Sequence, residues 1–164
     1  MFAVGAGRLL VGRSRFCDYP PEVDTQPIVG GFSDPNIEAV LALQPSLVVG
    51  AHGPAGPSLA ETLSAHGVAT NFPETESVDQ ICEMLIGIGE RLGQTVVARA
   101  LATRLKGQIL VLGEATKNLP APRAVMLFDV GPIVVAGPGG FPDEMVHLVH
   151  AQNLITEGGA YPTI

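Results

Sequence analysis

Residues 46–72, SLVVGAHGPAGPSLAETLSAHGVATNF, contain two short apolar runs on either side of a segment with helical periodicity. The runs at residues 46–51 and 68–72 include β-branched residues and are bounded by turn residues, a pattern typical of strands. Between them, residues 58–66 place leucines on one helical face before Gly67 ends the run. A strand, a helix and a second strand in this order predict parallel strands joined by a crossover helix.

The same alternation continues toward the N-terminus. Residues 8–14 predict another buried parallel strand, and residues 35–43 have the apolar spacing of a helix. Asp34 precedes this helix, where a carboxylate accepts hydrogen bonds from first-turn amides. Residues 1–76 are therefore predicted to form a Rossmann-like lobe built on a parallel sheet.

Helical periodicity dominates the middle of the chain. Apolar residues recur at helical spacing over residues 78–92, and Ser77 is placed to cap the first turn. A second helical run covers residues 94–117 and contains no proline. A helix of ~20 residues is ~30 Å long, which is enough to connect two lobes. Residues 77–118 are predicted to be this connector.

The remaining residues, 119–164, predict the start of a second α/β lobe. Two runs have strand character, at residues 124–129 and 133–136, and a helix is predicted over residues 142–150 after a glycine-rich turn. The fold class is therefore α/β, with a first parallel-sheet lobe, a long connecting helix and part of a second lobe.

Composition restricts the possible partners. The chain has 9 Lys and Arg against 16 Asp and Glu, a formal net charge of -7, and its basic residues are scattered. Nucleic-acid binding draws much of its affinity from clustered basic residues, so nucleic acid is not an expected partner. No run reaches the ~20 apolar residues of a membrane span, and residues 1–11 lack the features of a signal peptide.

Several motifs together resemble a known family. They are VGRSRFCDYPPE at residues 11–22, VGGFSDPNIE at 29–38, ALQPSLVV at 42–49 and VAGPGGF at 135–141. In their order and spacing they resemble the cobalamin-, siderophore- and haem-binding proteins of ABC importers, and Asp18-Tyr19-Pro20-Pro21 is the most specific part.

This resemblance implies two lobes joined by a rigid helix, with a metal chelate held between them and delivered to a membrane permease. It implies a periplasmic or extracytoplasmic location, no catalysis and no resident cofactor or metal, because the chelate is cargo. Members of the family extend beyond both ends of this sequence, so the chain is expected to be truncated. It contains no tryptophan, whereas the cobalamin receptors have one at the position of Ala51. This difference argues against cobalamin and leaves haem, a ferric siderophore or another chelate as the ligand.

The resemblance also implies ligand-binding residues, which are Phe16, Tyr19, Phe32 and His52. Phe16 and Tyr19 follow one predicted strand and His52 follows another, and open α/β sheets bind ligands at such positions. The alternatives are that Phe16 and Phe32 belong to the core, that Tyr19 stacks on its neighbouring prolines, and that His52 is a solvated loop residue.

Glu38 matches the position of a glutamate with which the family docks on permease arginines. A carboxylate and a guanidinium form paired hydrogen bonds that fix orientation. The alternative is a first-turn glutamate that interacts favourably with the helix dipole.

Other functions remain as alternatives. Cys17 is the sole nucleophile candidate and follows a predicted strand, so a small α/β enzyme using this thiol is one alternative hypothesis. A truncated remnant that self-associates through an open sheet edge is another. Glu144, His147 and His150 share a helix face, but a metal site of this type requires a second copy of the motif on a partner helix, so no metal site is predicted.

Overall fold

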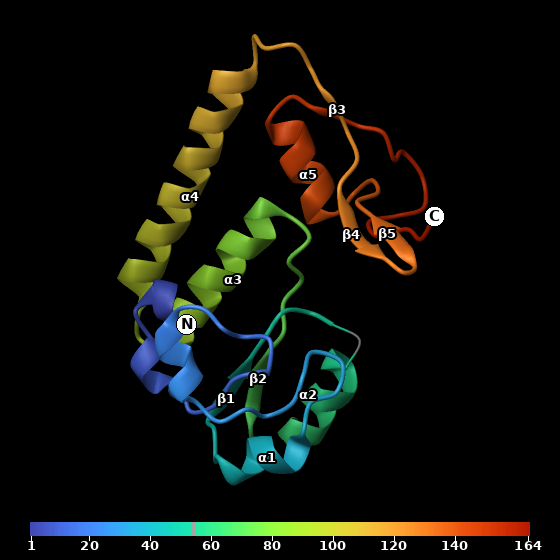
Figure 1. The fold of residues 1–164 in the computed structure, drawn as a ribbon. Helices are drawn as coiled ribbons and strands as arrows, with labels where there is room; N and C mark the ends of the chain where they lie inside the picture. The colour runs from blue at the N-terminus through green and yellow to red at the C-terminus, as the bar shows by residue number, and fades with distance from the viewer. Residues whose placement is uncertain (54) are drawn as a thin grey trace. The chain divides into compact units, whose positions relative to one another are not determined.

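The structure is a computed structural model that describes residues 1–53 and 55–164 (Figure 1). The chain divides into two compact units. Unit 1 comprises Met1–Glu74 and Leu85–Arg99, and unit 2 comprises Thr75–Met84 and Ala100–Ile164. The fold is α/β, as predicted, and both units contain a pair of parallel strands.

Unit 1 contains the β-α-β element predicted from residues 46–72. Strand β1 (Leu47–Val49) pairs in parallel with β2 (Ala69–Asn71), and helix α2 (Gly56–Ala65) connects them (Figure 1). The core of this element consists of buried Val40, Leu63 and Val68, with partly buried aliphatic side chains packed around them. Strand β1 is half-buried along its length, and β2 is half-buried except at exposed Ala69.

Helix α1 (Ile37–Ala42) begins later than predicted, and its cap differs. The side chain of Asn36, not that of Asp34, accepts a hydrogen bond from the main-chain N–H of Ala39 at 3.0 Å. Asp34 instead forms an ion pair with Arg15 at 2.8 Å. Asp and Asn are both good N-cap residues. Because the side chain of Asp34 pairs with Arg15, Asn36 provides the cap.

The strand predicted at residues 8–14 is wrong over most of its length. Gly7–Leu9 forms a 3-10 helix, η2, and a single parallel bridge joins Arg13 to Ile28. Further 3-10 helices, η1 and η3, occupy Phe2–Val4 and Pro21–Thr25. A strand needs a neighbouring ladder for its main-chain groups, and the hydrogen bonds here link the main chain of Arg13 only to that of Pro27 and Val29.

Helices α3 (Val78–Arg91) and α4 (Thr95–Thr116) each pass from one unit into the other. The hydroxyl oxygen of Ser77 accepts a hydrogen bond from the N–H of Gln80 at 3.1 Å, so the predicted cap is confirmed. Helix α4 is continuous over 22 residues, which confirms the long helix predicted at residues 94–117. Within the described residues, no helix combines the length and apolarity required to span a membrane.

Unit 2 contains short strands and one further helix. The predicted strand at residues 124–129 is divided into β3 (Arg123–Ala124), which pairs in parallel with β6 (Gln152–Asn153), and β4 (Leu127–Val130). Strand β5 (Ile133–Val135) pairs antiparallel with β4. Helix α5 (Phe141–Leu148) replaces the slightly longer helix predicted at residues 142–150.

A buried polar cluster fixes the start of α5. The amide nitrogen of Asn153 donates to the carbonyl oxygen of Ala136 at 3.1 Å and to Asp143 at 2.8 Å, and Asp143 also accepts from the N–H of Gly139 at 3.1 Å. Burial raises the pKa of Asp143, but the hydrogen bonds from Asn153 and Gly139 and the nearby His147 outweigh burial and lower this pKa below 3.8. The ionised carboxylate therefore holds α5 to the turn at Gly139.

We expect Asp143→Asn to reduce the free energy of unfolding by about 1.5 kcal/mol at pH 7, because hydrogen bonds to charged groups contribute roughly that much. The pKa of Asp143 is lower in the folded state than the value of 3.8 for an unperturbed side chain. Its contribution is thus present above about pH 3.8 and is lost as the pH falls further. Urea unfolding at pH 7 and pH 3 measures the difference, with Glu157→Gln as the exposed control in the same unit. An equal effect of Asp143→Asn at both pH values would contradict this prediction.

Candidate ligand-binding face

The carboxyl ends of the parallel segments in unit 1 are followed by loops that carry the predicted site residues. Strand β1 leads into residues 50–53 and β2 into residues 72–74. The bridged segments around Arg13 and Ile28 lead into residues 14–19 and 30–35. Ligands of open α/β sheets bind outside the carboxyl ends of the strands, so these four loops form the candidate ligand-binding face.

Arg13 holds the first of these loops in place. Its guanidinium donates to the carbonyl oxygen of Cys17 at 2.7 Å and pairs with Asp24 at 3.1 Å. The Arg13 side chain is only 12% exposed. Two residues further, the N–H of Arg15 donates to the carbonyl oxygen of Gly30 at 2.8 Å, which joins the first loop to the second.

Phe16 is 69% exposed, so its interpretation as a core residue is wrong. The guanidinium carbon of Arg15 lies 5.8 Å from the centre of the Phe16 ring, a cation–π distance. Arg15 in turn pairs with Asp34 of the second loop. The ring is therefore presented on the surface beside a fixed positive charge.

Phe32 is 54% exposed and is likewise not a core residue. Its ring lies against the main chain of Gly53, because a Cβ atom built on Gly53 would come within 2.3 Å of the ring. Glycine is therefore required at this position for the ring to remain where it is. This contact brings Phe32 to the loop that contains His52.

His52 is tied to the loop after β2. Its ring nitrogen Nδ1 lies 3.4 Å from a carboxylate oxygen of Glu74. The main-chain N–H of His52 donates to the carbonyl oxygen of Pro73 at 3.0 Å. Both side chains are about half exposed. His52 is therefore oriented by Glu74 while it remains open to solvent.

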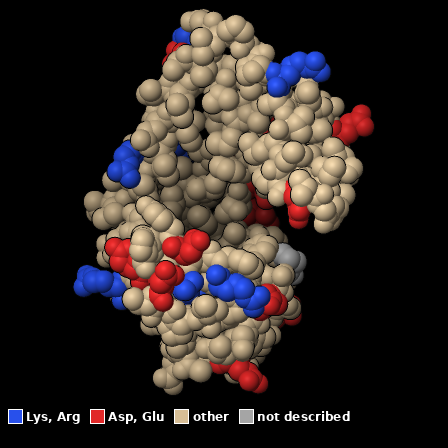
Figure 2. All heavy atoms as spheres, in the orientation of Figure 1, with Lys and Arg blue, Asp and Glu red and all other residues tan. Residues whose placement is uncertain are grey.

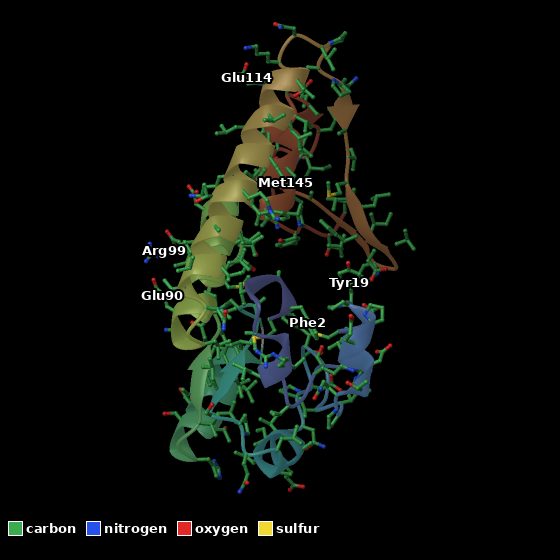
Figure 3. The ribbon with its side chains drawn as sticks, turned by 90° about the vertical axis from the view of Figure 1, so that its left-hand side faces the viewer. Phe2, Tyr19, Glu90, Arg99, Glu114 and Met145 are labelled. Atoms are coloured by element: carbon green, nitrogen blue, oxygen red, sulfur yellow. The ribbon has the colours of Figure 1, made fainter. Side chains whose placement is uncertain are left out.

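Tyr19 stands apart from the other predicted ligand residues. Tyr19 is 85% exposed and lies just before η3. Figure 3 labels it on this loop. Among the described residues, no hydrogen bond or aromatic contact joins it to Phe16, Phe32 or His52. The structure thus connects the other three positions through Arg15, Asp34 and Gly53 and leaves Tyr19 free.

The sequence interpretation missed Arg15, Asp34 and Glu74 as parts of this face. Each lies in a loop after a strand or bridged segment, which is the signal that could have identified them. Their acidic and basic groups are interleaved, and Figure 2 shows basic side chains of unit 1 beside acidic ones. A pattern of this kind differs from the continuous basic patch of a nucleic-acid interface.

Of the residues considered for other roles, Cys17 lies in the first loop of this face, and Glu38 and Glu144 lie on helices. Glu38 is exposed in the first turn of α1, as expected. The carboxylate of Glu144 accepts from the N–H of Val78 at 2.7 Å, and the described residues contain no cluster of His, Cys, Asp or Glu that could hold a metal ion. Cys17 is an exposed free thiol, and its sulfur lies 3.3 Å from the hydroxyl of Ser14.

Comparison with known proteins identifies relatives of the chain. It is 24% identical over its whole length to a cobalamin-binding protein of Halobacterium salinarum, of which it covers 46%. Its fold matches 61% of a periplasmic heme-binding protein from Pseudomonas aeruginosa with a TM-score of 0.87 and 26% identity, over 99% of this chain. It matches 64% of a periplasmic vitamin B12 binding protein of Vibrio cholerae with a TM-score of 0.85 and 24% identity, again over 99% of this chain.

The chain thus spans about half the length of this curated relative and under two thirds of each solved structure. The sequence model of the periplasmic binding proteins matches residues 1–164. The chain belongs to the periplasmic binding protein family.

Proposed function

We propose that the chain is part of the substrate-binding component of an ABC importer and captures a flat or compact metal chelate outside the cytoplasmic membrane. The observation that carries this proposal is the presentation of two exposed phenylalanine rings and an oriented histidine on one face of unit 1. The named ligands of the relatives, cobalamin and heme, support it. The proposed role is capture and delivery, without catalysis.

The chemistry of this face suits such a ligand. Aromatic rings offer a large contact area and lose little entropy when they are covered. An imidazole can hydrogen-bond to a chelate or coordinate its metal, because it suits iron, cobalt and zinc. The absence of tryptophan favours haem or a ferric siderophore over cobalamin, as the family resemblance implies.

Isothermal titration of the chain with haem, cobalamin and a ferric hydroxamate siderophore tests the proposal. We expect one of them to bind with a dissociation constant on the order of 1 μM or tighter, equivalent to about 8 kcal/mol. A dissociation constant above about 100 μM is what a nonspecific contact would give. If none of the three chelates binds more tightly than this, the proposed function is wrong.

Glu38 is the proposed docking residue for a permease. It is exposed on α1, and among the described residues it forms no ion pair. We expect Glu38→Gln to lower chelate uptake through a haem or cobalamin permease in liposomes about tenfold, the equivalent of ~1.4 kcal/mol, while the ligand dissociation constant stays the same. Glu61→Gln, an exposed acidic residue on α2, is the matched control. Unchanged uptake by Glu38→Gln would exclude this role.

Self-association through a sheet edge remains a prediction. Every residue of β4 is exposed, and within the described residues β5 is its sole strand partner. An open apolar edge is a template for pairing with a second copy. We expect sedimentation analysis to show a concentration-dependent dimer whose dissociation constant rises at least tenfold, about 1.4 kcal/mol, in Val130→Lys but not in Val96→Lys. A monomer at all concentrations would contradict this.

A further inference from the structure

We propose that Arg15 recognises an anionic group of the ligand, so that the preferred substrate is an apolar metal chelate with a carboxylate or similar oxyanion at its rim. This inference rests on the function proposed above and specifies the class of substrate. It assigns Arg15 a role in specificity and Asp34 a role in positioning Arg15.

The guanidinium of Arg15 is held in one place. A Cβ atom built on Gly31 would lie 3.2 Å from its Nη1 atom and 3.3 Å from its central carbon, so the group lies directly over the Gly31 main chain. Asp34 binds its Nη2 atom at 2.8 Å, and the Phe16 ring lies 5.8 Å from its central carbon. A donor that is already fixed loses little further freedom when a ligand binds.

Arg15 retains unused hydrogen-bond donors. A guanidinium has five N–H donors, and among the described residues only the bond from Nη2 to Asp34 is formed by this side chain. Its side chain is 45% exposed. Arg13 provides the contrast, because it is 12% exposed and uses both terminal nitrogens within the protein. Arg13 is therefore structural, whereas Arg15 can bind an additional acceptor.

The pair with Asp34 does not prevent this role. An exposed ion pair changes an equilibrium by less than about fivefold, so a ligand carboxylate can share or replace Asp34 at little cost. A hydrogen bond from a charged donor to the ligand can contribute about tenfold or more. The balance favours the ligand, particularly where the adjacent Phe16 ring is covered and water is displaced from the guanidinium.

The test compares chelates that differ in their anionic groups. The first pair is haem and its dimethyl ester, which have the same ring with free or esterified carboxylates. The second pair is a ferric carboxylate siderophore and a ferric trihydroxamate. We expect the wild-type chain to bind the carboxylate member of at least one pair ten times more tightly, and Arg15→Met to reduce this ratio to below about twofold. Arg15→Lys keeps the charge without the planar fork and should give an intermediate ratio.

Arg99→Met is the matched control, because Arg99 also forms an exposed ion pair in unit 1, with Glu90 at 2.6 Å, but lies on α4 outside the ligand-binding face (Figure 3). It should leave the ratio unchanged. Equal binding of both members of each pair by the wild type, or an equal loss for both in Arg15→Met, would overturn the inference and leave the proposed function intact. Absence of binding to all four chelates would contradict the proposed function itself, and the inference would fall with it.

Discussion

Simultaneous replacement of Phe16 and Phe32 by alanine is expected to weaken chelate binding about a thousandfold. Both rings are more than half exposed. If the ligand covers about half of each ring, it removes ~80 Å² of apolar surface per ring from water, or ~2 kcal/mol at about 25 cal/mol per Å². Each single replacement should therefore weaken binding about 30-fold. Isothermal titration of the two single variants and the double variant measures these losses.

The control for this prediction is an exposed apolar residue away from the face. Leu9, 56% exposed on η2, serves this purpose as Leu9→Ala. Because the phenylalanine rings contribute little to the core, all variants should unfold at nearly the same temperature. If the double variant binds as tightly as Leu9→Ala, the two rings do not contact the ligand.

Gly30→Ala is expected to destabilise the protein by more than about 3 kcal/mol, because it combines backbone strain with a steric clash. Gly30 has φ +108°, and a Cβ atom there would lie 2.5 Å from the nitrogen of Asn36 and 2.7 Å from the carbonyl oxygen of Asp34. Both are main-chain atoms, so no side-chain movement relieves the contact. The residual folded protein should also bind chelate weakly, since this turn carries Phe32.

Gly67→Ala separates the two contributions. Gly67 also has a positive φ of 75°, but no heavy atom lies within 4 Å of its added Cβ. Only the conformational cost remains, about 1–2 kcal/mol. Urea unfolding followed by circular dichroism compares the two variants, and equal stabilities would show that the chain relaxes around Gly30.

The elements found correctly from sequence are those with strong local periodicity. The β-α-β element at residues 46–72 and the long helix α4 both follow from apolar spacing and turn residues. The segment at residues 8–14 has the composition of a strand, but its main chain meets a partner strand only at Arg13. Composition alone does not specify such a partner, so a prediction based on it fails there.

The candidate site was predictable to a similar extent. Phe16 and His52 could be selected because they follow predicted strands, and Phe32 because it lies in a motif that resembles the family. The pairing of Arg15 with Asp34 spans 19 positions in the sequence, and the contact of Phe32 with Gly53 depends on how separate loops pack. Such contacts are set by tertiary structure, and they explain why Asp34 is a partner of Arg15 and not a helix cap.

Nuclear magnetic resonance shows most directly which residues of the chain contact the ligand. The measurement follows the amide signals of the nitrogen-15-labelled chain as the gallium form of a bound chelate is added. We expect the largest shifts at residues 14–19, 31–34 and 51–53, with small shifts along α2. Large shifts confined to α2 or to the β4–β5 hairpin, with these loops unchanged, would contradict the assignment of the ligand-binding face.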